Sequence, residues 1–349
     1  MTTKKILFLD IETDSLSITD ANIKFIGCLD ESNNYRCFNM QETKKEDVIK
    51  YLTNFDKLIT FNGERFDAPI LNKHGIKIDY WKHIDLYEIF KKRAVLLKSG
   101  GFKSYSLKNL IKEIGLNDYS KKEIDYHIFQ KSVWSSEELQ EIKEYLLQDL
   151  ILSKKLWEFL IDKFKPFGEF VNEEDKSNYR HITSSSGAYA YKVICNMLNM
   201  KEEYYDIEGN DKYEGAFVLQ PQKDNATNVL YLDFASLYPM LYVHANLFSS
   251  NCKCCKQEYK WHGNDMFKVD GYYCYKTQGK IEQLVKNFYI KRKEYKKNKD
   301  SREFAIKIIL NSLYGVSAKP SFKHLYSKYT ASDCTGLARQ CIIYAIKRL

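Results

Sequence analysis

The chain has 349 residues, 44% of them hydrophobic and 29% charged, which is the composition of an ordinary globular protein with room for two domains. Its formal net charge of +8 is moderate, so the placement of the charges matters more than their sum. No apolar run approaches membrane-spanning length, residues 1–5 lead into a strand rather than a secretory signal, and nine scattered cysteines favour reduced thiols, so we expect a cytoplasmic protein.

The first predicted element is an apolar strand over residues 6–13, whose end carries Asp10 and Glu12. Side chains two residues apart on a strand share a face. Both carboxylates can therefore point at one metal ion.

A second predicted strand covers residues 57–60 and is followed by a turn that contains Asn62 and Phe66. Asp67 then begins a helix, and Pro69 suits the first turn of that helix. An acid again follows directly on a strand and a turn.

Two helical patterns come next. Residues 105–115 predict an amphipathic scaffold helix with Ser106 as its N-cap and Gly115 at its end. The following pattern places Tyr145 and Asp149 four residues apart, on one helix face.

The helical pattern breaks near residues 165–172, where Pro, Gly and polar residues indicate a domain boundary. A capped helix is predicted from about residue 183 to 200. Tyr213 and Gly215 follow in a segment that a plain β-turn also explains.

Residues 229–239 predict a buried apolar strand that brings Asp233 to its end, followed at once by a turn with Ser236. A buried lone acid is costly unless something binds it, and Mg²⁺ prefers carboxylate oxygen. The alternative is an Asp that caps the next turn.

A basic amphipathic helix is predicted over residues 279–297, and a second helix follows the turn at residues 298–301. A solvated face or nonspecific attraction to phosphate would by itself explain such a run of Lys and Arg. The residues at helical spacing are Arg292 and Lys296 on the first helix, and Lys307, Asn311 and Tyr314 on the second.

These strings carry a resemblance to a known family. Asp233-x-x-Ser236-Leu-Tyr238-Pro239 and Lys307-x-x-x-Asn311-Ser312-x-Tyr314-Gly315 resemble the first two polymerase motifs of family B DNA polymerases. The earlier acids, in strand, strand, helix order, resemble the three motifs of the DEDDy 3′–5′ exonuclease domain of that family.

The resemblance implies an α/β chain in which a ribonuclease H-like exonuclease domain precedes an incomplete polymerase palm with a two-helix fingers subdomain. The implied boundaries are 1–168 for the exonuclease, 169–278 for the linker and N-terminal palm, 279–315 for the fingers and 316–349 for the start of the remaining palm.

The resemblance also assigns roles. In the exonuclease site, Tyr145 would orient the attacking water, and Asn62 and Phe66 would contact the frayed strand. The ligands of two Mg²⁺ or Mn²⁺ ions there would be Asp10, Glu12, Asp67 and Asp149.

In the polymerase site, Asp233 and the Phe234 carbonyl would bind metal, and Tyr238 would be the steric gate against ribose. The residues implied to bind nucleotide are Arg292, Lys296, Lys307 and Asn311, and those implied to lie along DNA are Tyr213, Gly215, Tyr314 and Gly315. The Tyr213 element matches the family's Tyr-x-Gly-Gly in part, because Ala216 stands in place of the second Gly.

Between the two polymerase motifs lies a group of cysteines with one histidine. Its spacing is irregular and does not provide a Cys-x-x-Cys pair on each side, so free thiols are favoured over a zinc site. The group consists of Cys252, Cys254, Cys255, Cys274 and His262.

Polymerase chemistry needs a second carboxylate, which the family takes from an Asp-Thr-Asp turn, and no such turn follows Asp233. We therefore expect the N-terminal part of a compact, phage-like polymerase from a prokaryotic or virus-infected cell, either split or truncated. Its partners would be primer-template DNA, dNTPs and a second polypeptide that carries the remaining palm and thumb. The alternatives are a stand-alone 3′–5′ exonuclease and a non-catalytic DNA-binding assembly subunit.

Overall fold

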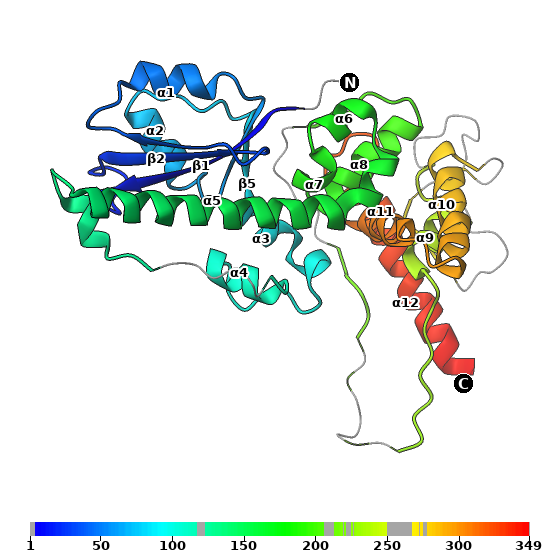
Figure 1. Ribbon diagram of the computed structural model, residues 1–349. Helices are drawn as coiled ribbons and strands as arrows, with labels where there is room; N and C mark the ends of the chain where they lie inside the picture. The colour runs from blue at the N-terminus through cyan, green and yellow to red at the C-terminus, as the bar shows by residue number, and fades with distance from the viewer. Residues whose placement is uncertain are drawn as a thin grey trace. The chain divides into compact units, whose positions relative to one another are not determined.

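The computed structural model describes residues 4–116, 123–205, 213–218, 220, 225, 227–249, 267–271, 273–274 and 278–348 (Figure 1). The chain divides into two compact units. The first unit comprises Met1–Lys165 and Ser177–Thr183, and the second comprises Pro166–Lys176 and Ser184–Leu349.

The first unit is built on a mixed five-stranded sheet of order β3-β2-β1-β4-β5. Its strands are β1 (Ile6–Thr13), β2 (Ile23–Asp30), β3 (Tyr35–Asn39), β4 (Lys57–Thr60) and β5 (His83–Asp85). The pairs β1–β2 and β2–β3 are antiparallel, whereas β1–β4 and β4–β5 are parallel, so the sheet is mixed.

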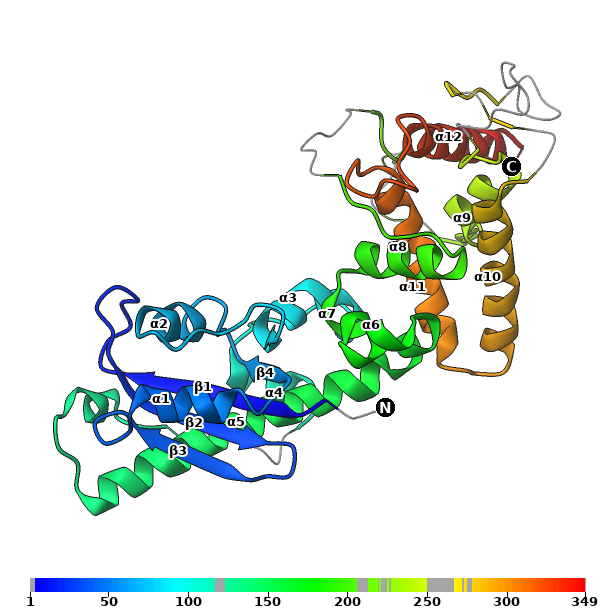
Figure 2. The same ribbon diagram turned by 90° about the horizontal axis from the view of Figure 1, so that it is seen from above.

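Helices cover both faces of this sheet, and β1 is therefore apolar on both sides. Leu7, Leu9 and Ile11 of β1 belong to a buried cluster that includes residues of α1 (Lys45–Leu52) and α2 (Asp67–Lys73). The opposite face carries α5 (Ser136–Phe164), which lies along the sheet (Figure 2).

The remaining elements of the first unit pack against α5, and a 3₁₀ helix among them also contacts β1. They are α3 (Leu86–Leu97), α4 (Leu107–Glu113), the 3₁₀ helix η1 (Tyr126–Gln130) and α7 (Arg180–Thr183). The predicted caps of α4 are confirmed: Ser106 Oγ accepts a hydrogen bond from the Asn109 N–H (3.3 Å), and Gly115 follows with φ +86°.

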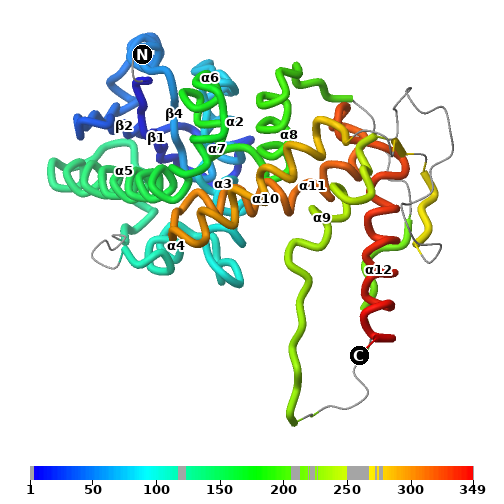
Figure 3. The backbone as a smooth tube through the Cα atoms, turned by 90° about the vertical axis from the view of Figure 1, so that its right-hand side faces the viewer, coloured from blue at the N-terminus to red at the C-terminus, as the bar shows by residue number. Residues whose placement is uncertain are grey.

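The second unit is helical in its described residues. Its helices are η2 (Lys165–Phe170), α6 (Glu173–Ser177), α8 (Ser186–Met197), α9 (Leu237–His244), α10 (Lys280–Lys297), α11 (Arg302–Ser317) and α12 (Thr330–Arg348). The apolar face of α11 packs against α8, α9, α10 and α12 (Figure 3). The predicted capped helix after residue 183 and the predicted helix pair after residue 279 are both confirmed.

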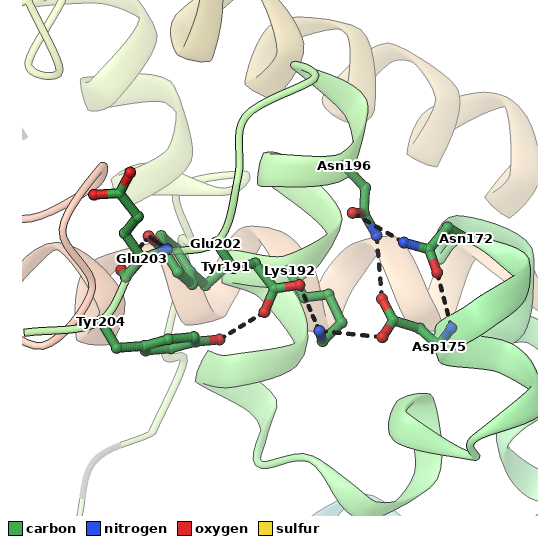
Figure 4. Close-up of polar contacts among 8 residues, drawn as sticks. All are labelled: Asn172, Asp175, Tyr191, Lys192, Asn196, Glu202, Glu203 and Tyr204. Atoms are coloured by element: carbon green, nitrogen blue, oxygen red, sulfur yellow. Dashed lines mark hydrogen bonds and ion pairs between the residues drawn. The ribbon is translucent and has the colours of Figure 1, made fainter.

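A buried polar network fixes the N-terminal part of this unit (Figure 4). Lys192 of α8 is 4% exposed, and its Nζ contacts Asp175 Oδ1 at 3.2 Å and Glu202 Oε1 at 2.5 Å. The Tyr204 hydroxyl donates to the other Glu202 oxygen at 2.8 Å. One cation therefore joins α6, α8 and the segment after α8.

The predicted buried strand before Asp233 is wrong. Val229, Leu230 and Tyr231 are 72%, 76% and 85% exposed, in an extended segment without strand pairing. A strand needs a hydrogen-bonded neighbour as well as an apolar pattern. None of the described segments supplies one here.

No helix within the described ranges is both long enough and apolar enough to cross a membrane.

Candidate active sites

Two acids of the first unit stand at the end of β1, on the face that α5 covers. Glu12 pairs with Phe25 of β2, and Phe25 packs with Tyr145 of α5. Because paired residues on neighbouring strands share a face, Glu12 lies on the α5 side, and so does Asp10, two residues earlier. Glu12 is 9% exposed.

Gly27 allows α5 to approach this part of the sheet closely. It pairs with Asp10, and a Cβ at this position would lie 3.1 Å from Leu150 Cδ1 and 3.2 Å from Leu146 Cδ2. Because Gly27 has no Cβ, the helix segment that carries Asp149 can pack directly on the strand beside β1.

Asp67 connects α2 to the same strand. It is the first residue of α2, is 3% exposed, and its Oδ1 accepts a hydrogen bond from the Ile11 N–H at 3.2 Å. Burial raises the pKa of Asp67, and the nearby Asp85 carboxylate raises it further. The third acid therefore bonds to the backbone between the first two.

Tyr145 and Asp149 are buried one turn apart on α5, as predicted. Burial raises the pKa of Tyr145, and the negative charges of Asp149 and Glu12 contribute in the same direction. Both carboxylates therefore lie within electrostatic range of one hydroxyl. That hydroxyl also pairs with the Tyr126 hydroxyl at 3.0 Å, a neighbour that no sequence pattern indicated.

The donor chemistry of these acids suits Mg²⁺ or Mn²⁺, which both prefer carboxylate oxygen. Within the described residues, however, no three His, Cys, Asp or Glu side chains are grouped so that they could hold a metal ion. The acids share one region of the sheet, and their joint role as ligands stays a prediction.

The turn between β4 and α2 carries the residues predicted to contact a DNA strand. Asn62 has a left-handed φ of +63°. Phe66 is partly buried against the apolar cluster of α1, α2 and β1. Sequence patterns missed Asp85, whose carboxylate accepts hydrogen bonds from the N–H groups of Asn62 and Glu64 (both 2.9 Å). Its signal was an acid at a strand end before a helix.

In the second unit, Asp233 and Phe234 are exposed on the extended segment before α9. Ser236 follows as the residue before α9, with φ +59°, and Tyr238 lies in the first turn of that helix. The conformation at Ser236 turns the chain from the segment of Asp233 into the helix of Tyr238.

Arg292 of α10 reaches this turn. Its Nη1 donates to Ser236 Oγ at 3.0 Å, and its Nε donates to Glu303 Oε1 at 2.7 Å. The structure therefore joins Arg292 to the turn that follows Asp233. Lys296, Lys307 and Asn311 are exposed on α10 and α11.

Three predicted tyrosines meet in the second unit. The Tyr213 hydroxyl donates to the Tyr314 hydroxyl at 2.9 Å, and the rings of Tyr238 and Tyr314 lie 5.2 Å apart in an edge-on arrangement. Burial raises the pKa of Tyr213, and its hydrogen bond with Tyr314 acts in the same direction. Residues from three separate motifs thus form one cluster.

Arg339 of α12, which sequence patterns also missed, fixes the backbone after Tyr213. Its Nη1 donates to the carbonyls of Glu214 (2.7 Å) and Gly215 (2.6 Å). A Cβ at Gly215 or at Gly315 would meet no atom within 4 Å, so both glycines border open space.

Most of the residues considered as thiols or zinc ligands lie outside the described residues, namely Cys252, Cys254, Cys255 and His262. Cys274 is buried, and its N–H donates to Ser249 Oγ at 2.7 Å.

Comparison with known proteins decides the family. The RNase H superfamily matches residues 7–161, and DNA polymerase family B matches residues 153–349. The chain belongs to DNA polymerase family B. The resemblance drawn from the motifs is thus confirmed, as is the fold class of an RNase H-like domain followed by a polymerase region.

Known family B polymerases match over most of this chain. It is 24% identical over 356 residues to DNA polymerase 1 of Sulfolobus acidocaldarius, covering 86% of this chain and 39% of that protein. For DNA polymerase 1 of Aeropyrum pernix the identity is 25% over 372 residues, covering 90% and 37%. The chain therefore spans about two fifths of these relatives.

A solved structure has the same fold. The family B DNA polymerase from Pyrobaculum calidifontis superposes with a TM-score of 0.65 at 16% identity, over 99% of this chain and 51% of that one.

Proposed function

We propose that this chain is the N-terminal part of a DNA-directed DNA polymerase that adds dNTPs to a primer 3′ end and proofreads by 3′–5′ excision. The observation that carries the proposal is that separate motifs converge within each unit. In the first unit, Asp67 bonds to β1 between Asp10 and Glu12. In the second, Arg292 reaches the turn after Asp233.

In the proposed excision reaction, Asp10, Glu12, Asp67 and Asp149 would hold the divalent ions. Two bound Mg²⁺ or Mn²⁺ ions would activate water and stabilise the departing 3′ oxygen. Burial raises the pKa of Tyr145. A protonated hydroxyl can donate a hydrogen bond, so Tyr145 would orient the attacking water and would not act as a base.

In the proposed synthesis reaction, Asp233 and the Phe234 carbonyl would hold the ions of the polymerase site. The Tyr238 ring would exclude a ribose 2′-hydroxyl, since its contact with Tyr314 limits where the ring can lie. The triphosphate would bind to Arg292, Lys296 and Lys307, next to Asn311. Primer and template would lie along Tyr213, Gly215, Tyr314 and Gly315, with Asn62 and Phe66 guiding a frayed end to excision.

The segment before Asp233 supports the proposal of a further polypeptide segment as partner. Residues 229–232 are apolar, extended and 60% to 85% exposed, which are the features of a strand that pairs with an added edge. The partner would bring this pairing strand, the second palm carboxylate and the thumb, either from a separate chain or from a longer one. The proposed location is the cytoplasm of a prokaryotic or virus-infected cell, where both template and dNTPs are present.

A labelled primer-template with Mg²⁺ tests the proposal. The chain alone is expected to shorten the primer from its 3′ end, and Asp10→Ala is expected to abolish this. Extension is expected only after a polypeptide with the remaining palm and thumb is added. Degradation that survives Asp10→Ala would disprove the exonuclease assignment, and no extension with any such partner would favour a stand-alone exonuclease.

A further inference from the structure

Asp85 is a buried carboxylate of the first unit whose hydrogen bonds converge on the turn before Asp67. It is 7% exposed, at the end of β5 and directly before α3. Its Oδ1 accepts from the N–H groups of Asn62 and Tyr87, and its Oδ2 accepts from the Glu64 N–H, each at 2.9 Å. One of these bonds caps α3, and the other two hold the turn at residues 62–64.

The turn needs such support because its geometry is demanding. Asn62 has φ +63°, which is uncommon for a residue with a side chain. Gly63 lies so close to β4 that a Cβ there would come within 2.3 Å of Thr60 Oγ1. Thr60 Oγ1 is itself hydrogen-bonded to His83 Nε2 at 2.7 Å, beside Asp85 on β5.

The turn is hydrogen-bonded directly to the helix that carries Asp67. The Gly63 carbonyl accepts from the Ala68 N–H at 2.8 Å, in the first turn of α2. Asp67 begins that helix, and its carboxylate bonds to Ile11 of β1. A shift of the turn would therefore move both Asn62 and the start of α2.

Both oxygens of Asp85 are engaged by backbone N–H groups, so this acid is placed to hold backbone. A carboxylate that accepts several N–H bonds holds backbone in place at short, charge-assisted distances. We infer, on the basis of the proposed excision of a 3′ end, that Asp85 is a positioning residue. It fixes the turn at residues 62–64 so that Asn62 meets the single-stranded substrate.

The test measures removal of nucleotides from a labelled single-stranded oligodeoxynucleotide in Mg²⁺, with the full chain. The variants are Asp85→Ala, Asn62→Ala and the double variant. Asp30→Ala is the matched control, since Asp30 Oδ1 likewise accepts a backbone N–H, from Asn34 at 2.8 Å in the β2–β3 turn. Asp85→Asn is the conservative variant, because its amide keeps an acceptor toward Asn62 and presents N–H₂ to the Glu64 N–H.

We expect Asp85→Ala to lower kcat/KM about 10- to 100-fold, mainly by raising KM, with a smaller loss in Asp85→Asn. Because both residues act through one turn, Asn62→Ala should add little to Asp85→Ala. Asp30→Ala should match the wild type. The Mg²⁺ concentration for half-maximal rate should change much less than KM in Asp85→Ala, because Asp67 keeps its own hydrogen bond to Ile11 of β1.

Three results would overturn the inference: a KM within twofold of the wild type, effects of Asn62 and Asp85 that multiply, or a large rise in the Mg²⁺ requirement. If Asp85→Ala does not fold, Asp85→Asn is used in its place. An unchanged KM in Asp85→Asn refutes the inference, whereas a raised KM that is not raised further by adding Asn62→Ala supports it. A wild-type chain that degrades nothing, or whose degradation survives Asp10→Ala, disproves the proposed function instead.

Discussion

Removal of the buried cation in the second unit would test what fixes its N-terminal part. Lys192 is 4% exposed and contacts two carboxylates, those of Asp175 and Glu202 (Figure 4). The Asp175 side chain is 4% exposed and also contacts Asn196 Nδ2 at 3.4 Å. Lys192→Met keeps most of the apolar stem and removes the charge.

The expected loss follows from the geometry. At the 3.2 Å separation of Lys192 Nζ from Asp175 Oδ1, the attraction is about 5 kcal/mol for an effective dielectric constant near 20. Removal of one partner leaves a buried carboxylate uncompensated, which costs about 3 to 5 kcal/mol in typical proteins. We expect Lys192→Met to lower the free energy of opening of α8 by that amount, and Asp175→Asn in the same background to restore part of it.

Hydrogen exchange read by mass spectrometry measures this locally, with α1 of the other unit as internal reference. The control is Lys155→Met, because the Lys155–Glu158 pair (2.6 Å) is 31% and 46% exposed and should contribute below about 0.5 kcal/mol. If protection of α8 falls by less than about 1 kcal/mol, or if the double variant is less stable than Lys192→Met, the assigned role of the cation is refuted.

Three further changes are expected to have defined effects. Burial raises the pKa of Glu282 from 4.5 to about 7, so the folded state binds the proton more tightly and its stability falls as the pH rises through that window. In urea unfolding, the free energy of unfolding of Glu282→Gln should match that of the wild type near pH 4.5 and exceed it by about 3 kcal/mol at pH 8; equal values at pH 8 would contradict this. Gly63→Ala should lower the melting temperature and 3′ excision together, because its Cβ would meet Thr60 within 2.3 Å; wild-type behaviour would contradict this. Ser135→Ala removes the capping box of α5 and should cost about 1 kcal/mol of unfolding free energy, whereas Ser136→Ala, one position later, should change little; equal losses would argue against the cap.

The local chemistry of the sequence predicted much of the secondary structure. The strand with Asp10 and Glu12, the Ser106 cap and the basic helix that carries Arg292 all formed as predicted. Each depends on residues within a few positions of one another, because caps and amphipathic faces are short-range features. The motif strings also identified the family, since they are specific in residue type, order and spacing.

Long-range contacts decided the rest. Asp85 acts on Asn62 from 23 residues away, and Arg339 reaches Gly215 across 124 residues. The apolar run at residues 229–232 has a strand-like sequence, yet it stays extended and exposed among the described residues. A strand and a converging hydrogen-bond site both need partners brought by the fold, so the sequence by itself determined which residues could act, and only tertiary structure determined which of them meet.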